Sequence, residues 1–288
     1  MPLILLPLIA SLGYALASLG LKRCLDYGIG PWRTTFVVNV MAGLLFLPML
    51  AWGKHWPGWE NIHQPLLAGL GFFIGQIFTF RAIARGDVSI VTPVLGLKSM
   101  LIAVICAVIL RENIPPGWWL ASALSVIAVA LLADRTPTRI KAVQATVLLA
   151  FISASAFSVT DVMVQRWTPI WSAGFFIPIM FATVALLSFT LIPIFNHPLH
   201  QIPRDGWKWL LGGSFLLCAQ ALVMACAIGI YGHATAINIV YSCRGVWTIA
   251  LVWIVGHWFG NDERHVGKVI LIRRLIGAVL LVAAIALL

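Results

Sequence analysis

Long apolar runs follow one another along almost the whole chain, and they constrain the fold more than any other feature of the sequence. A helix of about 20 apolar residues crosses the hydrocarbon core of a bilayer, which is roughly 30 Å thick. Backbone polar groups in lipid must be hydrogen bonded within the protein, so each run is expected to be helical. We therefore expect an all-α integral membrane protein. Ten transmembrane helices are expected, at residues 3–21, 33–53, 65–84, 88–110, 117–133, 143–164, 170–194, 207–230, 234–257 and 268–287.

The composition agrees with a membrane protein and excludes several other classes. Of the 288 residues, 61% are hydrophobic and only 10% are charged, whereas soluble domains carry about 25% charged residues. The formal net charge is +10, but no long basic run is present, and basic residues of membrane proteins gather in short loops beside anionic lipid. The five cysteines show no CxxC spacing, which argues against a disulfide framework or a metal site. Neither nucleic acid nor a cofactor is expected as a partner.

The two halves of the chain resemble each other. Residues 82–105 align with residues 227–252 when one gap is placed before the glycine of the first segment. We expect two five-helix repeats, residues 1–134 and 135–288, in one compact membrane domain. Because five is an odd number, the second repeat would enter the membrane inverted, as in many secondary transporters. The aligned pairs are Gly86 with Gly232, Ser89 with Thr235, Thr92 with Asn238, and Lys98 with Arg244.

Several of these features together resemble a known group of transporters. They are the five-plus-five duplication, the turn ARGDVSIVTPV (84–94) into the fourth span, Glu112 after that span, and the fifth helix WWLASALSVIAVALLAD (118–134). In this combination the chain resembles the drug/metabolite transporter superfamily of the EamA type. Asn39 departs from the pattern, since it lies near the place where many members carry an arginine. The resemblance implies a secondary transporter without a nucleotide-driven motor, and it implies no particular substrate class.

Lys98 lies near the middle of the fourth predicted span, and Arg244 lies at the same depth in the ninth. At 1.5 Å per residue, Lys98 is about 15 to 18 Å from either interface, too far for its side chain to reach water. Each buried cation costs about 2.5–3.5 kcal/mol on insertion scales, and such residues face the interior of a bundle or a watery cavity. If the two met, their repulsion would add on the order of 3 kcal/mol.

Three candidates could offset this charge. The first is a bound anionic substrate, held by the planar fork of Arg244 and the point charge of Lys98. The second is Asp161, the acidic residue that lies deepest in a predicted span. It could form an ion pair with Lys98 or carry a coupling proton, although it also lies close to Arg166 at the predicted end of that span. The third is desolvation that leaves the lysine neutral.

Other polar side chains in the predicted spans complete the candidate binding site. Asn238, Tyr241 and Arg244 share one side of the ninth span, and carboxamides in lipid need hydrogen-bonding partners. Together with Lys98 and Arg244, the candidate substrate-binding residues are Tyr241, Asn238, Gln76, Gln220, Asn39, Tyr14 and Trp247.

These observations predict a secondary transporter that moves a small anionic or zwitterionic metabolite by alternating access, with the two cations as a clamp. Two alternatives stay open. One is an exporter of amino acids or drug-like metabolites in which Lys98 is structurally paired with Asp161, and the other is a carrier of a lipid-linked phosphate. An enzyme is not expected, because the sequence shows neither a nucleophile–base arrangement nor HExxH. The protein could act as a monomer or a homodimer.

The loop charges predict the orientation. Of the 19 Lys and Arg residues, fourteen lie in or beside the connections after odd-numbered spans, and three (Lys54, Arg111 and Arg166) lie on the opposite side. The positive-inside rule then places both termini outside the cytoplasm. We expect a multi-pass protein of a bacterial inner (plasma) membrane.

Overall fold

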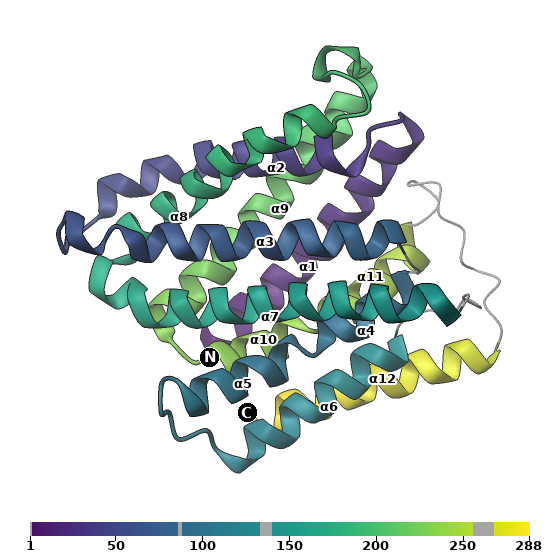
Figure 1. Ribbon diagram of the computed structural model, residues 1–288. Helices are drawn as coiled ribbons and strands as arrows, with labels where there is room; N and C mark the ends of the chain where they lie inside the picture. Colours follow the sequence, from purple (N-terminus) through teal and green to yellow (C-terminus); the bar gives the residue numbers. More distant parts are fainter. Residues whose placement is uncertain (1, 86–87, 133–139, 256–267) are drawn as a thin grey trace.

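The computed structural model describes residues 2–85, 88–132, 140–255 and 268–288, and within these ranges all regular structure is helical (Figure 1). Short 3-10 helices extend two of the α-helices: η1 (Leu47–Trp52) follows α2, and η3 (Phe189–Ile194) follows α8. Two more, η2 (Trp59–Asn61) and η4 (Leu199–Gln201), lie in loops. The α-helices are α1 (Pro2–Asp26), α2 (Pro31–Phe46), α3 (His63–Arg85), α4 (Val88–Gly96), α5 (Lys98–Val108), α6 (Pro116–Leu132), α7 (Ile140–Trp171), α8 (Ala173–Ser188), α9 (Arg204–Tyr231), α10 (Ala234–Tyr241), α11 (Arg244–Val255) and α12 (Lys268–Ala286).

The predicted class, an all-helical integral membrane protein, is confirmed. Seven stretches of the described residues are long and apolar enough to cross a membrane by length and composition, and α6 is a shorter apolar helix. The full set of ten spans and the inverted repeat stay predictions, and the predicted boundary between residues 134 and 135 lies outside the described ranges. The seven stretches are Leu3–Cys24, Pro31–Trp52, Trp59–Ile83, Val91–Val108, Gln144–Trp171, Ala173–Ile194 and Arg204–Tyr231.

Helices from the two halves of the chain interleave. The most extensive contacts join α1 to α9 and α3 to α7, and α2 packs against α8 while α6 packs against α12. In Figure 1 both chain ends lie at the same end of the bundle. Because each of these four helix pairs joins one half of the chain to the other, each half completes its packing only with helices of the other half.

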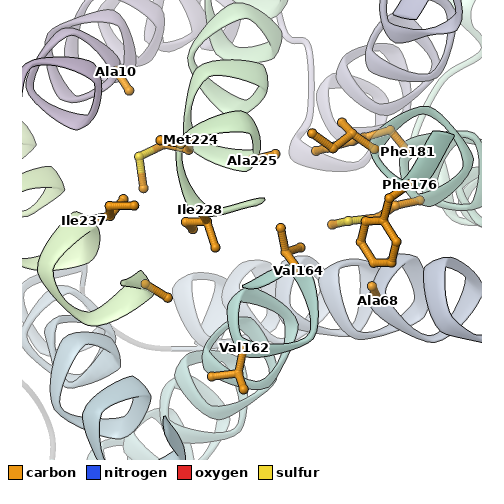
Figure 2. Packing of buried hydrophobic residues seen from close by; sticks show 14 of the residues in the cluster. Ala10, Ala68, Val162, Val164, Phe176, Phe181, Met224, Ala225, Ile228 and Ile237 are labelled. Carbon is orange, nitrogen blue, oxygen red and sulfur yellow. The ribbon is translucent and has the colours of Figure 1, made fainter. Parts of the chain in front are cut away.

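The core is an apolar cluster to which helices of both halves contribute. Figure 2 shows side chains of α1, α3, α7, α8, α9 and α10 that converge on one region, among them Ala68, Phe181 and Ile228. Association of helices in lipid depends on close packing more than on removal of apolar surface from water. Gly43 and Gly69 permit this packing, since a Cβ atom on either would come within 2.6 Å of α8.

Two of the predicted spans are interrupted, which the sequence analysis did not anticipate. The predicted span 88–110 is divided at Leu97 into α4 and α5, and the predicted span 234–257 is divided at Ser242 and Cys243 into α10 and α11. In the first, Pro93 lacks a backbone N–H and Gly96 lacks a side chain, and both weaken a helix. In the second, the Ser242 hydroxyl donates to the Asn238 carbonyl, a bond that often bends helices.

Two backbone hydrogen bonds at the first interruption have counterparts at the second, where Ser242 and Gly245 donate further bonds. Each has an N–H that donates to the carbonyl three residues back, followed by one that donates four residues back. The bonds are Leu97 N to Val94 O (3.1 Å) and Leu101 N to Leu97 O (2.9 Å) in the first, and Cys243 N to Val240 O (3.1 Å) and Trp247 N to Cys243 O (3.0 Å) in the second.

Candidate functional site

A cavity of about 260 Å³ lies among the helices of both halves. Its lining combines aliphatic and aromatic side chains with a smaller polar set, which is the usual make-up of a small-molecule site. Most of the predicted site residues line this cavity. Its polar lining residues are Tyr14, Asn39, Gln76, Thr79, Lys98, Asp161, Gln220, Tyr241 and Arg244.

Lys98 forms an ion pair with Asp161. The Lys98 Nζ lies 2.8 Å from the Asp161 Oδ2, and both side chains are mostly buried, with exposed fractions of 20% and 14%. The Asn238 side-chain amide donates to the same Oδ2 at 2.7 Å, and the Lys98 ammonium lies 5.7 Å from the Phe157 ring centroid. The lysine, the aspartate and the asparagine therefore join α5, α7 and α10, and the protein itself supplies the counter-charge of Lys98.

The placement of Asp161 corrects one detail of the sequence analysis. The predicted span ended at residue 164, which would put Asp161 close to the membrane edge and to Arg166. Instead, α7 continues through Pro169 to Trp171, because prolines are tolerated within transmembrane helices. Asp161 therefore lies three turns from the end of its helix, and its partner is Lys98, whereas Arg166 is exposed.

Arg244 has a different environment. Its guanidinium lies 5.0 Å from the ring centroid of Tyr14 and 4.8 Å from that of Tyr241. These are distances at which a cation is attracted by the ring quadrupole. The Tyr241 hydroxyl donates to Gln220 Oε1 at 2.8 Å, which fixes the ring. Within the described part of the chain, Arg244 forms no ion pair, and its charge interacts with the two tyrosines and, less strongly, with Asp161.

A third polar group joins α2, α3 and α8. Asn39 and Gln76 exchange two hydrogen bonds, at 2.8 and 2.9 Å, and the Asn39 amide also donates to Ser188 Oγ at 2.8 Å. Both carboxamides line the cavity. Their mutual bonds satisfy the requirement for partners on which the sequence prediction rested.

Two predicted site residues lie outside the main cavity. Asn238 is buried and borders a much smaller hollow of about 20 Å³ beside it. Trp247 packs with the apolar cluster of Cys243 and Leu281. Trp247 therefore does not line the cavity, although it follows Arg244 by three residues on α11.

Sequence reasoning missed two groups of residues. One is a set of phenylalanines on the cavity wall, Phe72, Phe157 and Phe181, which look in sequence like any lipid-facing aromatic residue. The other is Gln165, which donates to Glu112 and accepts from the backbone N–H of Ala234. A glutamine inside an apolar run was a usable signal for this second contact.

Comparisons with known proteins agree with this architecture. Residues 1–133 match the model of the EamA-like transporter family. No curated protein sequence matches the chain. One solved structure, titled only "Crystal structure of protein", has a TM-score of 0.76 and 16% sequence identity, covering 99% of this chain and 96% of that chain. At that identity the likeness shows a shared fold.

Proposed function

We propose that this chain, whose residues 1–133 match the model of the EamA-like transporter family, is a secondary transporter of a small anionic or zwitterionic metabolite. The substrate would bind in the central cavity, and Arg244 would hold its negative group. Tyr241 and Gln220 would orient the guanidinium, and Lys98 would act through its ion pair with Asp161.

The observation that carries this proposal is the charge of Arg244. A guanidinium is charged at any physiological pH, and an unpaired charge in an apolar interior is costly. Arg244 lines the cavity, and among the described residues it has no carboxylate oxygen within 4 Å. A substrate anion would supply the missing counter-charge and take a two-pronged hydrogen bond.

Alternating access is supported by the correspondence between the two halves. Two backbone hydrogen bonds at the interruption before Lys98 have counterparts at the interruption before Arg244. In addition, α2 with η1 and α8 with η3 each consist of 16 α-helical residues followed by 6 residues of 3-10 helix. Transporters with inverted repeats bind substrate where discontinuous helices of the two repeats meet, and they expose the site alternately by rocking one repeat against the other.

The test is a thermal-shift screen of the purified protein in detergent against carboxylates and phosphate esters, each with its uncharged analogue. We expect some anions to raise the melting temperature of the wild type and of Arg166→Gln, a control that removes an exposed arginine of α7. Arg244→Gln should lose this stabilisation. Equal stabilisation of Arg244→Gln and the wild type would contradict the proposal.

The ion pair favours a second candidate function, an exporter of amino acids or drug-like metabolites in which the Lys98–Asp161 pair is structural. Exchanging the two residues, in a Lys98→Asp/Asp161→Lys variant, keeps the charge balance but reverses the direction of the pair. Uptake or efflux retained by this variant would favour the second candidate. Transport lost by a variant that still folds would favour direct participation of the pair in binding.

A further inference from the structure

We propose that the cavity selects monovalent organic acids with an apolar body, and that it discriminates against dianions such as phosphate esters. This inference rests on the proposed function, because it assumes that the cavity binds the transported molecule through Arg244. It narrows the proposed substrate class from any small anion to monoanions whose uncharged part is apolar.

The charge follows from the three ionised side chains on the cavity wall. Lys98 and Asp161 cancel, since their charged atoms lie 2.8 Å apart. The Asn238 amide donates to the same carboxylate, which holds it in place against competition from a ligand. Arg244 then leaves the wall with a net charge of about +1, and one negative charge on the ligand balances it. A dianion would bring a second negative charge into the cavity without a partner.

The apolar body follows from the apolar majority of the lining. Phe72 of α3 packs edge-to-face against Phe157 of α7 and against Phe181 of α8, with ring centroids 5.4 Å apart in each pair, and all three line the cavity. Met180 and Met224 also line the cavity, and thioethers adapt readily to apolar ligands. A phosphorylated sugar would have to leave several hydroxyl groups without hydrogen bonds against these side chains.

Arg244 and the three phenylalanines come from different helices, although Gln76 and Asp161 share α3 and α7 with Phe72 and Phe157. Arg244 and its two tyrosines belong to α11, α1 and α10, whereas the three phenylalanines belong to α3, α7 and α8. A ligand with its acid group at Arg244 would place its apolar part in the cavity that these phenylalanines also line. An apolar cavity of about 150 Å³ accommodates benzene, so the 260 Å³ found here suits about ten non-hydrogen atoms.

The experiment compares four probes of matched shape by calorimetry on the purified full chain at pH 8. They are 3-phenylpropionate, its uncharged amide, the zwitterion phenylalanine, and phenyl phosphate, which is a dianion at this pH. We expect 3-phenylpropionate to bind the wild type about tenfold or more tightly than each of the others, the gain typical of a charge-assisted hydrogen bond.

Charge variants make the test specific. Asp161→Asn raises the net charge of the cavity wall to about +2. The affinity for phenyl phosphate, relative to that for 3-phenylpropionate, should therefore rise about tenfold. Lys98→Gln/Asp161→Asn returns the charge to about +1, and the monoanion should again bind more tightly than the dianion. A purely structural role of the pair would change both affinities together and leave their ratio unaltered. If Asp161→Asn does not fold, the ranking of probes by the wild type and the double variant still decides.

The outcomes separate the two proposals. Tighter binding of phenyl phosphate or phenylalanine than of 3-phenylpropionate to the wild type, with loss in Arg244→Gln, would overturn this inference and leave the proposed function standing. If Arg244→Gln binds every probe as the wild type does, Arg244 has no part in binding, and both proposals fail.

Discussion

Lys98 and Arg244 occupy equivalent positions in the two halves of the molecule, but the protein treats them differently. Each begins the second part of an interrupted helix, α5 or α11, and each contacts the first helix of the other half. On α7 that helix presents Asp161 to Lys98 at 2.8 Å. On α1 it presents the ring of Tyr14 to Arg244 at 5.0 Å.

The difference shows two ways in which the protein accommodates a buried cation, one structural and one suited to binding. An ion pair in a low-dielectric interior offsets the cost of burying both charges only when its geometry is good, and Lys98–Asp161 meets that condition with an added bond from Asn238. Aromatic rings attract a cation but leave its charge in place. One half of the cavity is therefore internally neutral, and the other half carries the net charge of Arg244.

The largest loss of stability is expected when the Lys98–Asp161 ion pair is disrupted. Asp161→Leu leaves Lys98 without a counter-charge and should reduce the free energy of unfolding by about 3 kcal/mol. The measurement is the melting temperature in detergent, with Lys98→Met/Asp161→Leu as the matched control. The double variant should regain most of the loss because no unpaired charge remains, and equal losses in both variants would show that the pair is not the cause.

A smaller loss of stability is expected when Arg244 is replaced. Arg244→Gln removes two cation–π contacts, but it also removes the cost of burying a charge that has no acid partner, so the net loss should not exceed about 1–2 kcal/mol. The same unfolding measurement applies. A loss as large as that of Asp161→Leu would mean that Arg244 has an anionic partner within the protein, which would remove the distinction between the two halves.

The smallest effect concerns the ring of Tyr14. Tyr14→Phe keeps an aromatic face below the guanidinium, whereas Tyr14→Leu removes it and should cost about 1 kcal/mol. Anion affinity should follow the same order, since the rings hold Arg244 in its orientation. If Tyr14→Phe and Tyr14→Leu melt at the same temperature, the contact between the ring and the cation does not contribute to stability.

Much of this architecture could be predicted from sequence because polar residues stand out within apolar runs. Lys98, Arg244, Gln76 and Gln220 were each identified from the cost of placing such groups in lipid, and all four line the cavity. The pairing of Lys98 with Asp161 was one of three alternatives, since the sequence alone could not decide how far α7 extends beyond Arg166.

Other parts of the site could not be predicted from the sequence, for physical reasons. The cavity phenylalanines have the same apolar signature as lipid-facing ones, so periodicity does not identify which helix they meet. The stacking of Tyr14 on Arg244 depends on how α1 crosses α11, and no residue pattern within either helix sets that crossing. The helix interruptions carried a signal in Pro93 and Gly96, and paired interruptions of this kind point to a binding site.

Two double-mutant cycles test most directly the claim that Lys98 is neutralised within the protein while Arg244 is not. The first pairs Lys98→Met with Asp161→Leu, and the second pairs Arg244→Met with Asp161→Leu, with unfolding free energy measured in the absence of ligand. We expect the Lys98–Asp161 coupling to exceed the Arg244–Asp161 coupling by at least about 1 kcal/mol. Couplings of equal size, or a larger one for Arg244, would contradict the account.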